Sequence, residues 1–174
     1  MKKLKLLELN RVSVEDYGNV PKVSLVVVSD NIRSAMNVGS LFRTADAMAV
    51  ERVVLCGISA VPPNREITKT AIGAEESVNW SYYEHTIDAL KDLKAEGYQI
   101  IAIEQTNESI ELKKFPITSD KITIVMGNEV DGVSADVLHL LDGAIEIEQF
   151  GTKHSLNVSV CAGIVMHHLA SKMR

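Results

Sequence analysis

Three segments of this sequence combine glycines and polar side chains of the kinds that build ligand sites. They are Ser29–Ala45, Val125–Gly132 and Gly151–Ala162, and the first two follow apolar runs that read as strands. A parallel α/β sheet binds ligands beyond the carboxyl ends of its strands, so these segments are the places to expect chemistry. None contains G-x-G-x-x-G or G-x-x-x-x-G-K-[ST], and a nucleotide-like cofactor would therefore bind by another arrangement.

The first segment contains Asn37, Gly39 and Arg43. Asn37 is a candidate helix cap, Gly39 allows the backbone to come close to a neighbour, and Arg43 projects about a turn and a half further along. Taken alone, this pattern is better explained as a strand-to-helix turn with an ordinary surface arginine.

In the second segment two glycines surround Glu129, as expected for a loop whose backbone lies against a ligand while the carboxylate accepts hydrogen bonds. A polar turn ending at a glycine is the simpler explanation. In the third segment Ser155, Asn157 and Ser159 open a predicted helix, where exposed amides form a site for an anion or a polar ligand. Capping by Ser155 or Asn157 explains one of these residues but not all of them.

A hydrolase is poorly supported. The sequence has no G-x-S-x-G elbow, and His154 beside Ser155 is no evidence that the serine is activated.

The elements that would position these segments alternate along the chain. Short apolar, β-branched runs predict strands at Val23–Val28, Arg52–Cys56, Tyr98–Ile103, Ile122–Val125 and Ala144–Ile147. Helical spacing predicts a helix over Thr86–Glu96, with Thr86 as cap and Gly97 as its left-handed stop. A longer helix is predicted over Ser155–Met173, with a core face drawn from Leu156, Ser159, Val160, Gly163, Ile164 and Met166 or His167. The stretch Gly57–Gly73 reads as loop-rich. Together they predict an α/β fold with a mostly parallel sheet flanked by helices.

Length and composition narrow the class of protein. The 174 residues, 46% of them hydrophobic, suit a single domain over 1–174, with 1–20 as a short N-terminal extension and no separate RNA-binding domain. No membrane span or signal peptide is recognisable, so a cytoplasmic protein is expected. Cys56 and Cys161 lie far apart and outside metal-ligand spacing, so no metal is expected.

The net charge of −5 argues against binding nucleic acid through bulk electrostatics, and any RNA contact must be local. Basic residues gather at the N-terminus and again between Arg33 and Lys69. Either a basic face or scattered solvated charges would explain this pattern.

Together and in this order, the three segments resemble the motifs of the SpoU, or TrmH, branch of the SPOUT RNA methyltransferases, and the resemblance spans nearly the whole chain. The matching residues are Asn37-x-Gly39-x-x-x-Arg43-Thr44-Ala45, then Gly127-x-Glu129-x-x-Gly132, then Ser155-Leu156-Asn157-Val158-Ser159 with Ala162 a turn later. Three spaced motifs are far more specific than any one of them.

The resemblance implies a C-terminal deep trefoil knot and a homodimer with its active site near the subunit interface. It implies transfer of a methyl group from S-adenosylmethionine to a ribose 2′-hydroxyl of RNA, with S-adenosylhomocysteine as the second product. Transfer RNA is the favoured substrate and ribosomal RNA the second. The implied catalytic residues are Arg43, Asn37, Glu129, Ser155 and Asn157. The implied cofactor residues are Glu104, Gln105, Thr106, Met126, Gly127, Ile147, Gln149, Gly151, Ser155 and Leu156.

One departure from the family pattern affects the cofactor loop: Ile147-Glu148-Gln149 stands where the family commonly has Ile-Pro-Met. Losing the fixed φ of proline is expected to loosen this loop, and the added carboxylate changes the local field. Two other functions remain as alternatives, a noncatalytic RNA-binding protein that retains the fold and a methyltransferase acting on a small molecule or a protein.

Overall fold

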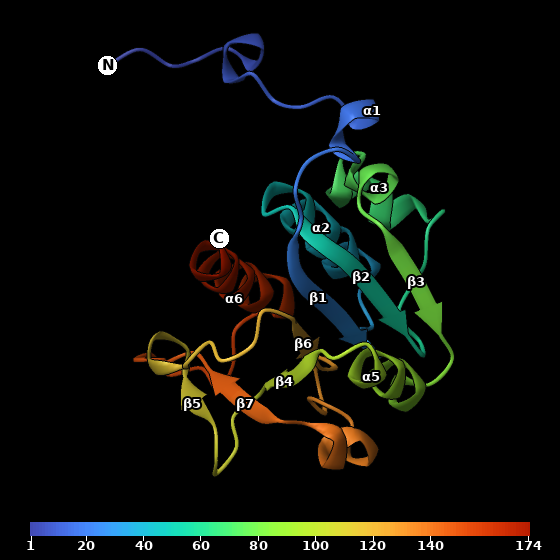
Figure 1. The fold of residues 1–174 in the computed structure, drawn as a ribbon, viewed down its shortest axis with the longest axis vertical. Helices are drawn as coiled ribbons and strands as arrows, with labels where there is room; N and C mark the ends of the chain where they lie inside the picture. The colour runs from blue at the N-terminus through green and yellow to red at the C-terminus, as the bar shows by residue number, and fades with distance from the viewer.

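A seven-stranded sheet forms the centre of the computed structural model, which describes residues 1–174 apart from the side chains of Leu6 and Leu7. The strand order is β3-β2-β1-β6-β4-β7-β5, and neighbouring strands run parallel (Figure 1). The strands are β1 (Val23–Asp30), β2 (Val50–Cys56), β3 (Trp80–Tyr83), β4 (Gln99–Ile103), β5 (Ile110–Glu111), β6 (Ile122–Met126) and β7 (Gly143–Glu146).

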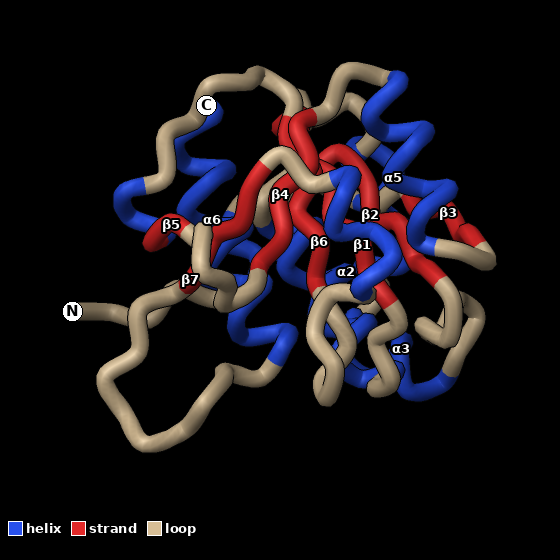
Figure 2. The backbone as a smooth tube through the Cα atoms, turned by 90° about the horizontal axis from the view of Figure 1, so that it is seen from below, coloured by secondary structure: helices blue, strands red, loops and turns tan.

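Helices cover both faces of this sheet (Figure 2). One apolar core joins the sheet to α2 (Ala35–Ala47), α3 (Arg65–Ala71), α4 (Ala74–Ser77) and α6 (Val158–Met173). A second core joins the opposite face to α5 (Thr86–Ala95) and the 3-10 helix η3 (Ala135–Leu140). The remaining short elements are η1 (Leu6–Leu9), α1 (Val14–Tyr17) and η2 (Leu112–Lys114).

The central strand β1 shows why two cores are needed. Leu25 and Val27 pack into the first core, whereas Val26 and Val28 pack into the second. Successive side chains of a strand point to opposite faces, so the unbroken apolar run Leu25–Val28 requires cover on both sides. The predicted α/β fold with a parallel sheet is confirmed; the trefoil knot stays a prediction.

The five predicted strands are present, with bounds shifted by one or two residues. The edge strands β3 and β5 were not predicted, because β3 exposes every second side chain and β5 is only two residues long. The prediction of a loop-rich Gly57–Gly73 was wrong in part, since α3 lies within it. There the Asn64 side chain caps the helix by accepting the backbone N–H groups of Glu66 and Ile67.

Two predicted caps were wrong. Ser34, not Asn37, occupies the cap position of α2, where its hydroxyl accepts the Asn37 N–H. His85 precedes α5, and the Thr86 hydroxyl instead donates to the buried Asp30 carboxylate at 2.6 Å. The stop at Gly97 is confirmed by its φ of +88°.

The predicted core face of α6 was largely wrong. The helix begins at Val158 after the Asn157 cap, and it buries Val158, Ala162, Val165, Met166, Leu169 and Ala170. Val160 and Ile164 are 52% and 41% exposed. Counting the period from Leu156, which lies before the helix, selected the wrong face; only Met166 was placed correctly. No helix in the described part of the chain is long and apolar enough to span a membrane.

Candidate functional site

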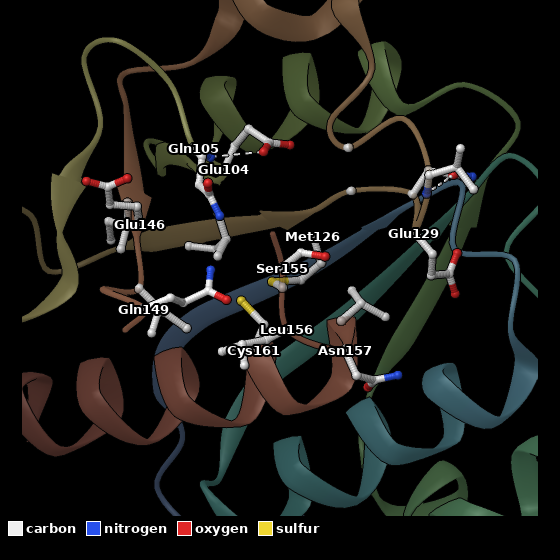
Figure 3. Close-up of a pocket in the computed structure, with 18 residues that line it drawn as sticks. Glu104, Gln105, Met126, Glu129, Glu146, Gln149, Ser155, Leu156, Asn157 and Cys161 are labelled. Carbon is white, nitrogen blue, oxygen red and sulfur yellow. Dashed lines mark hydrogen bonds between the residues drawn. The ribbon is translucent and has the colours of Figure 1, made fainter. Parts of the chain in front are cut away.

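The carboxyl ends of β6, β4 and β7 meet at one edge of the sheet. Ile103 pairs in register with Met126 on one side and with Ile145 on the other, so the residues that follow these strands lie side by side. A cavity of about 390 Å³ opens here (Figure 3). Its lining is Ile103–Gln105, Met126–Val130, Gly132, Ile145–Ile147, Gln149, Ser155–Val158 and Cys161. The volume is within the range of small-molecule and cofactor sites, which is about 300 to 1,000 Å³.

Polar side chains on the cavity wall hold neighbouring loops together. The Glu104 carboxylate accepts the backbone N–H groups of Gln105 at 2.9 Å and Val133 at 3.1 Å. The Gln105 side chain donates to the His154 carbonyl oxygen at 2.9 Å, which connects the loop after β4 to the segment before α6. Figure 3 shows the hydrogen bond between the Gln105 N–H and the Glu104 carboxylate. The cavity wall is therefore built from segments that are distant in sequence but bonded to one another.

The two glycines of the second segment are required by close backbone packing. A Cβ atom on Gly127 would lie 2.2 Å from the carbonyl carbon of Gly132 and 2.3 Å from the amide nitrogen of Val133. Gly132 has a φ of +71°, and a Cβ there would lie 2.2 Å from a Glu104 carboxylate oxygen. The loop thus folds back on itself in a way that side chains at these positions would prevent.

Gly39 in the first segment has a similar role between helices. Its missing Cβ would lie 2.4 Å from the Ile67 carbonyl oxygen and 2.1 Å from the Thr70 hydroxyl. The prediction that Gly39 allows a close approach is confirmed, and the neighbour is helix α3.

Glu129 lies at the end of the cavity nearest α2 (Figure 3). Its carboxylate accepts the backbone N–H groups of Arg33 at 2.9 Å and Ser34 at 3.2 Å, and the Asn37 side-chain amide at 3.0 Å. Burial alone raises the pKa of Glu129, but these hydrogen bonds outweigh it and lower the pKa below its usual value. An ionised carboxylate is favoured at the N-terminus of a helix, and one with three donors bound is a poor proton acceptor. The Glu129 carboxylate therefore holds the Arg33–Ser34 backbone and the Asn37 side chain in place.

One chain of hydrogen bonds joins the three segments. Asn37 donates to Glu129, and its side-chain oxygen accepts from the Asn157 amide at 3.2 Å. Asn157 in turn caps α6 by accepting the Ser159 and Val160 backbone N–H groups. Segments separated by about 90 residues or more in sequence are thus fixed against one another beside the cavity.

The structure brings most of the predicted cofactor residues together. All of them line the cavity except Thr106 and Gly151. Of the predicted catalytic residues, Glu129, Ser155 and Asn157 line the cavity, and Asn37 is bonded to two of these. Arg43 is separate: it lies on the exposed side of α2, outside the lining, and makes no hydrogen bond or ion pair with the described residues.

Asp30 is a residue that sequence reasoning missed. It is fully buried at the end of β1, and its carboxylate accepts the Thr86 hydroxyl at 2.6 Å and both the N–H and the hydroxyl of Ser134, at 2.7 and 3.0 Å. It thereby fastens the start of α5 and the residues after Gly132 to the central strand. A carboxylate at the end of a buried, mostly apolar strand was the available indication.

Cys161 was also missed as a residue of the site. It lies on α6 and lines the cavity, and its pKa is raised to about 11, mainly by burial and secondarily by the Glu104 charge. The thiol is therefore protonated at neutral pH and gives the cavity a small hydrophobic surface with a weak S–H donor.

Comparison with known proteins adds independent evidence. Residues 24–167 match the model of the SpoU rRNA Methylase family. The chain is 35% identical over 158 residues to a 23S rRNA (guanosine-2′-O-)-methyltransferase of Neisseria meningitidis, a match that covers 90% of this chain and 62% of that protein. It is 30% identical over 146 residues to a tRNA (guanosine(18)-2′-O)-methyltransferase of Aquifex aeolicus, covering 82% of this chain and 67% of the relative. The chain thus spans about two thirds of the length of these relatives.

Solved structures agree with the fold. The A. aeolicus TrmH/SpoU tRNA modifying enzyme superposes with a TM-score of 0.79 at 26% identity, covering 91% of this chain and 80% of that one. An AdoMet-bound rRNA methyltransferase of Sinorhizobium meliloti gives the same TM-score at 23% identity, covering 90% of this chain and 59% of that one.

Proposed function

The chain belongs to the SpoU rRNA Methylase family, and on this basis we propose that it is an RNA methyltransferase acting on a ribose 2′-hydroxyl. S-adenosylmethionine is the proposed methyl donor and S-adenosylhomocysteine the second product. The observation that carries the proposal is the hydrogen-bonded chain Glu129–Asn37–Asn157, which unites the three family segments at one end of a cavity of cofactor size.

The cavity suits S-adenosylmethionine in both size and chemistry. Apolar side chains of Ile103, Ile145 and Leu156 offer surface for an adenine ring. The carboxylates of Glu104 and Glu146 are acceptors for an amino group and favour a positively charged ligand. When bound, this cofactor supplies an activated methyl group with a neutral thioether as leaving group.

The protein's own task is then to position and polarise the ribose. A guanidinium stays protonated at neutral pH and is a poor base, so Arg43 is proposed to bind the phosphate beside the target ribose and to stabilise the developing negative charge on the ribose oxygen. Its free position on the exposed side of α2 leaves its donors available for a phosphate. The hydroxyl proton leaves to phosphate or water, since the Glu129 carboxylate already has three donors.

A homodimer with the site near the subunit interface is part of the proposal. Arg43 lies outside the cavity of its own chain, and a site completed across two subunits would account for this separation. The exposed Val160 and Ile164 on α6 provide apolar surface for such contact. The proposed location is the cytoplasm, where RNA substrates occur.

Transfer RNA is the first proposed substrate and ribosomal RNA the second, and the printed activities of the relatives include both. The test incubates purified protein with methyl-labelled S-adenosylmethionine and either tRNA or rRNA from cells that lack the gene. A labelled product that disappears on ribonuclease treatment supports the proposal, because the label is then in RNA. Cofactor binding without transfer to either RNA would contradict it, and absence of cofactor binding would favour a noncatalytic RNA-binding protein.

A further inference from the structure

Glu148 lies between two cavity residues but its side chain points elsewhere. Ile147 and Gln149 line the 390 Å³ cavity, whereas the Glu148 carboxylate accepts from the Lys113 ammonium at 2.5 Å. Lys113 also lies 3.4 Å from the Glu111 carboxylate. The segment therefore presents alternate residues to the cavity and to a charged cluster behind it.

Strand pairing creates this cluster. β5 pairs with β7 so that Glu111 is opposite Glu146, and the residues after each strand continue next to each other. A second cavity of about 190 Å³ lies between them, lined by Glu111, Leu112, Lys113, Ile147, Glu148 and His168. Ile147 borders both cavities, so the two cavities adjoin at this residue, and residues 147–149 form the wall between them.

Few hydrogen bonds hold this wall and the segment that follows it, residues 148–156. Within the part of the chain that the structure describes, two hydrogen bonds tie residues 148–156 to the rest of the protein: Lys113 to Glu148, and Gln105 to the His154 carbonyl. Hydrogen bonds to Glu148 and Glu111 raise the pKa of Lys113, so its ammonium remains protonated through neutral pH. The free energy of local opening is low for a segment with so few hydrogen bonds, so losing either of the two bonds is expected to disorder it.

We propose that Lys113 is a positioning residue: its ion pair with Glu148 fixes the 147–149 wall so that Ile147 and Gln149 meet the bound cofactor. This inference rests on the proposed function, because it assigns the cavity to S-adenosylmethionine. Lys113 itself does not line that cavity, so it acts through Glu148.

The chain offers a matched control in Lys114. Its ammonium pairs with Glu111 at 2.7 Å and its side chain is 65% exposed, compared with 61% for Lys113, but within the described residues it makes no hydrogen bond or ion pair with residues 147–149. Lys113→Met and Glu148→Gln each remove the proposed link, whereas Lys114→Met removes an equally exposed charge without touching it.

The first measurement is S-adenosylmethionine affinity by isothermal titration. Exposed ion pairs have modest effects, so the dissociation constant of Lys113→Met and Glu148→Gln is expected to rise about two- to fivefold near 0.05 M salt, and by less near 0.5 M salt, where charges are screened. The double variant should resemble either single one, because both remove the same interaction. Lys114→Met should match the wild type. Equal effects of Lys113→Met and Lys114→Met, or no effect of Lys113→Met, would overturn the proposal.

Hydrogen exchange of the cofactor-free protein separates this inference from the proposed function. Amides of residues 148–154 should exchange faster in Lys113→Met than in the wild type or Lys114→Met. If the wild type binds no S-adenosylmethionine, the proposed function fails, and this exchange difference still tests whether the ion pair orders the wall. Unchanged exchange in Lys113→Met would show that it does not.

Discussion

Replacing Gly127 with alanine would put a methyl group into the backbone of its own loop. The new Cβ would lie 2.2 Å from the Gly132 carbonyl carbon, and ordinary contacts of this kind begin near 3.4 Å. The backbone at Gly127 and the backbone at Gly132 must therefore move apart by roughly 1.2 Å, the difference between these two distances. Because the opposing atoms are backbone, no change of side-chain rotamer can relieve the contact.

The expected effects of Gly127→Ala follow from this displacement. Overpacking of this kind typically lowers the free energy of unfolding by about 1–3 kcal/mol. Gly127 lines the cavity, and a shift of about 1 Å in a positioned site can reduce activity by up to about 100-fold. We expect the unfolding midpoint in urea to fall and S-adenosylmethionine affinity, measured by isothermal titration, to fall at least tenfold, roughly 1.4 kcal/mol.

Gly18→Ala is the control for this experiment. Gly18 has a φ of −58°, a Cβ there would have no heavy atom within 4 Å, and the residue does not line the cavity. This variant should change unfolding free energy by less than about 0.5 kcal/mol and leave cofactor affinity unchanged. Normal stability and normal affinity in Gly127→Ala would refute the assignment of Gly127 to a close backbone contact beside the cofactor.

Three further outcomes are expected. Asp30→Ala leaves the Thr86 hydroxyl and two donors of Ser134 without their buried acceptor and should lower unfolding free energy in urea by about 3 kcal/mol or more, whereas a loss below about 1 kcal/mol would contradict this role. Because the pKa of Glu129 is lowered on folding, its stabilisation is complete above about pH 4.5 and is lost as pH falls through the folded-state pKa. The stability gap between wild type and Glu129→Gln should therefore narrow in acid, and a constant gap would count against the predicted shift. Cys161, with its pKa raised to about 11, should react slowly with iodoacetamide at pH 8 and more slowly still with S-adenosylmethionine bound; lack of protection would place the cofactor elsewhere.

Much of the sheet could be predicted from sequence because buried parallel strands are apolar at nearly every position, as in β1 and β6. The edge strand β3 could not, since half of its side chains are exposed and its pattern is weak. The face of α6 was misjudged for a different reason. The helix is apolar around much of its surface, so a three-residue error in its start selects the wrong face.

The site residues were predictable by type and spacing, but their partners were not. Nothing in the sequence alone indicates that Asn37 bonds to Glu129 and to Asn157, because these contacts depend on the order of strands in the sheet. The same is true of Glu148, which the sequence marks only as a departure from a family pattern. In the structure it has a partner, Lys113, on a strand connection that sequence reasoning left unassigned.

The most direct test of the central claim is nucleoside mass spectrometry of RNA treated with the purified protein and S-adenosylmethionine. The proposed function predicts one new ribose-methylated nucleoside with an unmodified base, formed by the wild type and absent with Arg43→Ala, whose cofactor binding is retained. A methylated base, or near-normal ribose methylation by Arg43→Ala, would contradict it.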